Sequence, residues 1–257
     1  MTDYSYDIPS KTEMDNNPKK WTSLPLMADD YILKLAKIEL GYSPTWINGS
    51  PDYNNMQPIF KVVCLPFALK AGGQMRFTDK SEVKPLNHWI FRDIAFGTGF
   101  QQDKVTPSFM RALLCYMEGI EVEDNFTVKK PLLLDPQGHE SHDEELTRQT
   151  IAELKGLEPQ NLIGQGYKVV PDIRIYEGRY IGCALEVATN KKGDKTNKIV
   201  RFSKLPETFV PPTPDQEREL MKDFEERYAK MKAKQATGGV STASVQNEPL
   251  NMAEVPF

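Results

Sequence analysis

The chain has 257 residues, of which 39% are hydrophobic and 26% charged, and its formal net charge is −4. That length supports one sizeable core, and no apolar run reaches the roughly 18 residues that a membrane-spanning helix needs. Residues 1–20 also lack the apolar core of a secretory signal. These features exclude membrane-spanning and secreted classes, so we expect a cytoplasmic protein.

The charges and cysteines are unevenly placed. Residues 161–206 carry nine basic and four acidic side chains, whereas residues 135–160 carry two and seven and residues 207–257 carry six and nine. A basic segment with acidic flanks is typical of a protein that binds polyanions. Cys64, Cys115 and Cys183 are scattered singly, which predicts buried, inert thiols and neither a disulfide framework nor a metal site.

The first half of the chain predicts an arm, three strands and a helix. Residues 1–25 are broken by prolines and predict a flexible arm. The strand predictions are Tyr31–Leu40, Pro58–Phe67 and His88–Phe96, with the turn-rich stretch Thr45–Met56 as a loop. Thr106-Pro107 starts the predicted helix and Gly119 ends it.

Residues 135–160 predict an acidic helical insertion. Ser141 and Glu144 have capping-box spacing, and Gly156 is the expected stop. The apolar face of this helix is thin, which favours a place on the surface.

The clearest β signal follows the insertion. Residues 167–176, 179–189 and 198–204 predict a three-stranded meander. Alternation places Ile173 and Ile175 on the core face and Tyr176 and Tyr180 on the opposite face.

We therefore expect a mainly β chain with α additions (α+β). Its centre, residues 26–206, is predicted as an OB-type, partly open β-barrel with a helix after strand three, although an all-β sandwich has a similar strand count. Thr213 and Pro214 begin a long C-terminal helix within residues 207–235. Residues 236–257 are Gly/Ser/Thr-rich at first and predict a flexible linker with a terminal peptide.

An OB barrel binds single-stranded DNA with a basic groove and with aromatic side chains on which bases stack. The sequence places such side chains side by side at several predicted strands. The DNA-binding candidates are Trp89, Phe91, Arg92, Arg174, Tyr176, Arg179, Tyr180, Lys191, Lys192, Lys195, Lys198, Arg201 and Phe202.

The end of the chain predicts a partner-binding peptide, Glu254-Val255-Pro256-Phe257. A Phe ring with its own α-carboxylate fits a small apolar pocket beside a basic residue. This tip resembles the tails of bacterial single-stranded-DNA-binding proteins, which implies replication or recombination proteins as partners. It departs from them in having only Glu248 and Glu254 as acids.

Several short motifs resemble a family of phage OB-fold single-stranded-DNA-binding proteins. They are Tyr31-Ile-Leu-Lys-Leu, Trp89-Ile-Phe-Arg, Phe109-Met-Arg-Ala-Leu-Leu, Leu162-Ile-Gly164 and Asn197-Lys-Ile-Val-Arg-Phe202. The resemblance implies a role in phage DNA replication or recombination, in the host cytoplasm, without strong sequence preference. The acidic insertion lies outside the family pattern.

Two other classes fit less well. An enzyme would need a phosphate loop, a nucleophile elbow or a metal-binding His pair, none of which the sequence contains; His139-Glu-Ser-His142 lies in a polar loop without a second cluster. We therefore expect no enzymatic activity and no cofactor. A virion or scaffold protein assembling through the C-terminal helix is the main alternative, and the oligomeric state is open.

Overall fold

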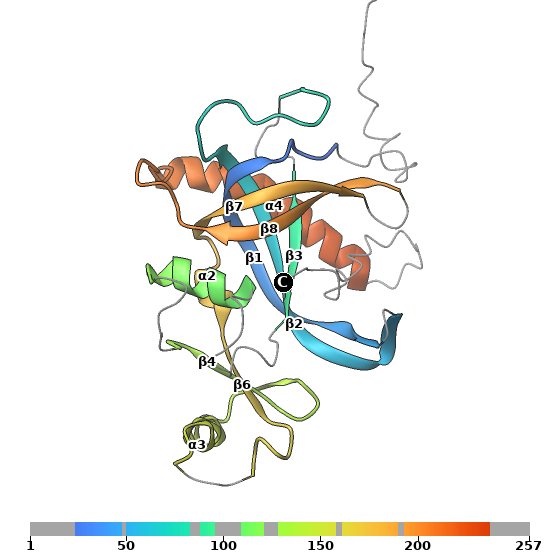
Figure 1. The fold of residues 1–257 in the computed structure, drawn as a ribbon, viewed down its shortest axis with the longest axis vertical. Coiled ribbons are helices and arrows are strands. Elements are labelled where there is room, and N and C mark those ends of the chain that lie inside the picture. The colour runs from blue at the N-terminus through green and yellow to red at the C-terminus, as the bar shows by residue number, and fades with distance from the viewer. Residues whose placement is uncertain are drawn as a thin grey trace, which may run out of the picture.

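The computed structural model describes residues 24–47, 50–82, 88–95, 109–120, 128–157, 161–189 and 193–236. Within these ranges the chain is mainly β with a few helices (Figure 1), so the α+β prediction is confirmed. The predicted arm before residue 24, the turn residues Lys191 and Lys192, and the C-terminal peptide lie outside the described residues. No helix in the described ranges has both the length and the apolar composition needed to cross a membrane.

The main sheet has five antiparallel strands in the order β3-β2-β1-β7-β8. They are β1 (Asp29–Ile47), β2 (Ser50–Leu69), β3 (Ile90–Ala95), β7 (Tyr180–Thr189) and β8 (Lys195–Ser203). The two edge strands, β3 and β8, contact each other, but no ladder joins them in the described part of the chain. The sheet is therefore strongly curved and not closed into a barrel.

Alternation along the strands builds the core inside this curve, because successive side chains of a strand face opposite sides. Leu33 and Leu35 of β1 and Phe202 of β8 point inward and are buried. Helix α2 (Phe109–Glu118), which follows β3, packs Met110 and Leu113 against the same core. The three cysteines are free and buried, as predicted, and burial raises the pKa of Cys64 to about 12.

The stretch predicted as a loop, Thr45–Met56, is instead the end of a long two-stranded ribbon. β1 and β2 stay paired from Tyr31 opposite Leu69 to Ile47 opposite Ser50, and the ribbon projects from the sheet (Figure 1). The sequence between the last pair is Asn48-Gly49, the dipeptide most typical of a two-residue hairpin turn. This turn signal favours a hairpin more strongly than the surrounding turn-forming residues favour a loop.

The acidic insertion, residues 135–160, is part of a larger unit that also includes the strands on either side of it. Strands β4 (Pro131–Leu134), β5 (Glu140–Ser141) and β6 (Lys168–Pro171) form a second sheet, covered by α3 (Glu144–Leu154). The prediction of a strand over residues 167–176 was therefore wrong. β6 pairs with β4 rather than with β7, and residues Ile173–Tyr176 form the 3₁₀ helix η4.

The cap of α3 also differs from the prediction. The Asp143 side chain, not Ser141, accepts a hydrogen bond from the Leu146 N–H at 2.9 Å. Gly156 follows the helix with φ of 70°, a conformation that favours glycine, so the predicted stop is confirmed.

A side-chain bridge joins the open edges of the main sheet. Asn197 of β8 exchanges two hydrogen bonds with the backbone of Leu26, at 2.7 and 3.0 Å, and its Oδ1 lies 2.9 Å from His88 Nε2 beside β3. Oδ1 only accepts, so His88 donates from Nε2, and in the neutral ring Nδ1 is then the unprotonated nitrogen. Nδ1 is buried without a partner in the described structure, and burial lowers the pKa of His88.

This bridge predicts a pH-dependent stability. Because the pKa of His88 is lower in the folded chain than in the unfolded one, the unfolded chain binds more protons once the pH drops below about 6.5. The free energy of unfolding should then fall with pH in that window. Chemical denaturation of His88→Gln should show a weaker fall, whereas the exposed His139→Gln and His142→Gln should behave like the parent. Equal pH dependence in all four proteins would contradict the assignment.

Candidate nucleic-acid interface

The structure sorts the thirteen predicted DNA-binding residues into separate places. Some are in the core, one is in an ion cluster at the insertion, some lie under the C-terminal helix, and some are exposed cations. Each group has its own consequence for binding.

Three candidates are built into the core. Phe202 is 2% exposed, Tyr176 2% and Arg92 7%. The Tyr176 hydroxyl donates to Glu118 at 2.6 Å, so the prediction that Tyr176 faces away from the core was wrong. Its backbone belongs to η4, where strand alternation does not apply. None of the three side chains has a face free for a base in this conformation.

Arg92 is unusual among the buried side chains. Its guanidinium carbon lies 3.7 Å from the centroid of the Phe109 ring, and its Nε has no hydrogen-bond partner in the described structure. Burial lowers the pKa of Arg92 to about 10, partly offset by neighbouring Asp93. Arg92 therefore acts as a core side chain stacked on the first residue of α2, where its charge interacts with the aromatic face.

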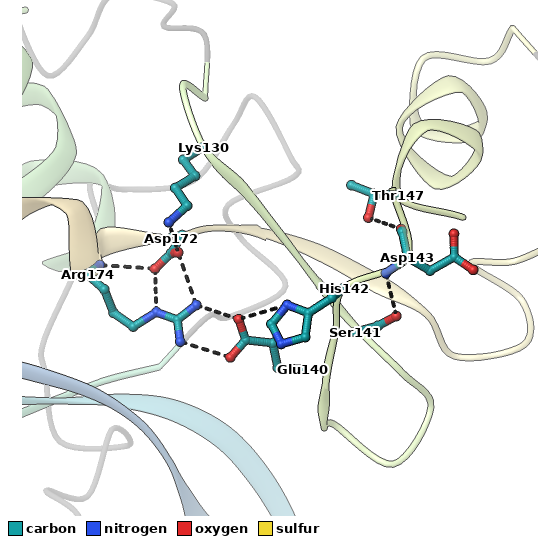
Figure 2. Close-up of polar contacts among 8 residues, drawn as sticks. All are labelled: Lys130, Glu140, Ser141, His142, Asp143, Thr147, Asp172 and Arg174. Atoms are coloured by element: carbon teal, nitrogen blue, oxygen red, sulfur yellow. Dashed lines mark hydrogen bonds and ion pairs between the residues drawn. The ribbon is translucent and has the colours of Figure 1, made fainter. Parts of the chain in front are cut away.

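Arg174 is the centre of an ion cluster that joins β5 to the start of η4. Figure 2 shows its guanidinium between two carboxylates. Nη1 and Nη2 donate to Glu140 of β5 at 2.9 and 2.7 Å, and Nε donates to Asp172 at 2.7 Å. Lys130 lies 3.2 Å from the other oxygen of Asp172. With these donors engaged, Arg174 is occupied by protein and not available to a phosphate.

The carboxylates of this cluster are held ionised. Burial would raise the pKa of Asp172, but hydrogen bonds from Arg174 and Lys130 outweigh it and lower that pKa. The hydrogen bond from Arg174 also lowers the pKa of Glu140. A bidentate arginine of this kind gives geometric precision as well as energy, and here it fixes β5 against the start of η4.

The aromatic candidates Trp89 and Phe91 lie on the outer face of the main sheet, under α4 (Pro214–Ala236). Phe224 of α4 is 1% exposed and packs against Ala36 of β1 and against Val63 and Leu65 of β2. The rings of Trp89 and Phe224 are 5.0 Å apart, and Tyr228 stacks on Phe224 at 5.4 Å. α4 thus covers the outer surface shared by the first three strands.

Tyr180 lies at the other end of α4 beside a buried charge. Lys34 of β1 is 2% exposed; its ammonium donates to the Gly178 carbonyl at 2.7 Å, pairs with Glu217 of α4 and lies 4.7 Å from the Tyr180 ring centroid. Burial and the nearby Glu217 raise the pKa of Tyr180. Lys34 was not among the predicted site residues, since a lysine inside an apolar strand run reads as solvent-facing.

The segment between β8 and α4 also lies against the sheet. Phe209 contacts the rings of Tyr180 and Phe67 at 5.3 and 6.0 Å. A Cβ on Gly182 of β7 would lie 2.7 Å from the Lys204 carbonyl oxygen, so the chain leaves β8 in close contact with β7. This segment and α4 together cover much of the outer face.

The remaining candidates that the structure describes are cations at the surface. Lys195 and Arg201 of β8 are exposed and Lys198 is partly exposed, as is typical of a solvated edge strand. Lys198 lies opposite Glu186 of β7, and Arg201 lies 3.9 Å from Asp30. Arg179, exposed beside Tyr176, is separated from them along β7. Apart from Arg179, the described candidates outside the core and the ion cluster thus form two groups: aromatic side chains under α4 and cations on β8.

Comparison with known proteins does not identify a family for this chain. No protein-family model, curated protein or solved structure matches the chain. Among the described residues, no group of His, Cys, Asp and Glu side chains could hold a metal ion.

The ion cluster generates a prediction about stability. Arg174→Ala should lower the free energy of unfolding by about 2 kcal/mol, because it leaves the buried Asp172 carboxylate with Lys130 as its only side-chain partner beside the backbone N–H of residue 174. Arg179→Ala, which removes an exposed arginine only five residues away, should change stability by less than about 0.5 kcal/mol. Thermal unfolding followed by circular dichroism measures both. An unchanged stability for Arg174→Ala, with weaker DNA binding, would return Arg174 to the interface.

Proposed function

We propose that the protein binds single-stranded DNA without strong sequence preference, on an OB-type frame, in DNA replication or recombination. The observation that carries this proposal is the strand order β3-β2-β1-β7-β8 with a helix between β3 and β7. An OB barrel has this order, with its first strand paired to its second and fourth, and binds oligonucleotides on its second and third strands and on the loops after strands one and four.

The elements that correspond to those loops have suitable chemistry. The β7–β8 hairpin carries Lys195, Lys198 and Arg201 on its described part and Lys191 and Lys192 in the turn sequence. The β1–β2 ribbon, the second of these elements, projects beyond the sheet. Lysine and arginine side chains in such positions follow a phosphate backbone without reading bases.

The main alternative is a scaffold protein that assembles through the C-terminal helix. The apolar side chains that assembly would use, Met221, Phe224 and Tyr228, pack on the sheet of the same chain. No observation therefore favours assembly over binding.

The proposal predicts a salt-dependent affinity. A labelled dT oligonucleotide titrated at several salt concentrations should bind with a log–log slope that falls by about 2 when Lys195, Lys198 and Arg201 are all replaced by Ala, because each phosphate contact on a single strand contributes about 0.7. The matched control is Lys222→Ala with Lys230→Ala, two exposed cations on α4. If both variants have the same slope, β8 is not part of the DNA interface.

The peptide Glu254-Val255-Pro256-Phe257 remains a proposed binding site for replication or recombination proteins. Deleting residues 248–257 should leave the affinity for dT within about twofold of the parent while abolishing co-purification of such partners with the tagged protein. A loss of DNA binding on deletion would assign the peptide to the DNA interface instead.

A further inference from the structure

Helix α4 lies where an OB-type sheet would bind a strand. The outer face of β2 and β3 offers Val63, Leu65, Trp89 and Phe91, and each contacts α4 or the cluster around Phe224. With α4 in place, Trp89 and Phe91 are partly buried, so much of each ring is covered and not open for stacking. The cations of β8 stay exposed, but a strand bound only to them would gain no stacking.

The contacts of α4 are of the kinds that a single strand would make. The Phe224 ring meets Trp89 edge-on, with an interplanar angle of 62°, and Tyr228 continues the stack at 23° to Phe224. The Glu217 carboxylate pairs with the buried ammonium of Lys34. A single strand offers the same two kinds of group: the aromatic face of a base and the anionic oxygen of a phosphate.

α4 is also suited to leave the sheet while remaining a helix. Phe224 is the only fully buried side chain on its described part. Thr213 and Gln216 cap its start reciprocally, and Asp215–Arg218 and Asp223–Arg227 pair along its surface. Caps and such pairs stabilise a helix without help from the sheet.

We infer that α4 is an intramolecular competitor of single-stranded DNA: it occupies the aromatic face of β2 and β3, and binding requires its displacement. This inference rests on the proposed function. Displacement uncovers Trp89 and Phe91 for stacking, and it frees Lys34 from Glu217 so that a phosphate replaces the carboxylate.

The test locks α4 in place and measures binding. Glu39 of β1 and Lys232 near the end of α4 form an ion pair, so Glu39→Cys with Lys232→Cys places two thiols close enough for a short, reducible bis-thiosulfonate. The native cysteines are buried and do not compete. In the full chain, cross-linking should weaken binding of labelled dT at least tenfold, and reduction should restore it. Equal affinity before and after cross-linking would overturn the inference while leaving the proposed function in place.

A second variant weakens the packing of α4 on the sheet instead. Phe224→Ala should strengthen dT binding several-fold relative to Glu226→Ala, an exposed position on the same helix, with folding of both checked by circular dichroism. Binding by Phe224→Ala when the parent binds nothing would support the inference most strongly. Failure of the parent, the reduced double-cysteine protein and Phe224→Ala all to bind at low salt would reject the proposed function, and the inference with it.

Discussion

The buried ammonium of Lys34 is the constraint on which the outer half of the structure depends. Lys34 lies on β1, the central strand, whose residues from Tyr31 to Ala36 are buried on both faces. A charge removed from water needs partners of good geometry, or it destabilises the fold by several kcal/mol. Here the partners are the Gly178 carbonyl and Glu217. The first turns of α4 are therefore held in place by a charge and not by apolar area alone.

That constraint explains how a largely polar helix comes to lie on a sheet. α4 contacts β1 through Lys34 near its start and through Glu39 near its end, and between them Phe224 is buried in the cluster of Ala36, Val63 and Leu65. Burial would raise the pKa of Glu39, but hydrogen bonds from Lys232 and Tyr228 outweigh it and lower that pKa. The helix is thus fixed by a short apolar stripe, Met221, Phe224 and Tyr228, and by one ion pair near each end.

Local signals in the sequence predicted much of this fold. Some errors came from choosing between competing local signals, as at Thr45–Met56, and the others arose where pairing is non-local. The glycine after α3 was found because it acts within one turn. Residues 167–176 were taken as one strand because nothing local shows that Lys168–Pro171 pairs with Pro131–Leu134. Tyr176 and Arg174 then appeared to share an exposed face, whereas the first is in the core and the second holds Glu140. Lys34 could not be found, because its partner Glu217 lies 183 positions away.

The aromatic residues show most clearly what a sequence leaves undecided. Trp89 and Phe91 beside cations indicate a stacking surface, but helix rings and bases satisfy that surface equally well. A ring of α4 and a base compete for this surface on comparable terms. An aromatic pair contributes about 0.5–1.5 kcal/mol on top of the area it buries, and a stacked base contributes about 1–3 kcal/mol in total. A tethered helix has an effective concentration of order millimolar, so under the proposed function α4 would exclude short or weakly bound ligands. A strand long enough to stack on both rings and reach the β8 cations would make more contacts, and the occupied face would then favour extended single strands.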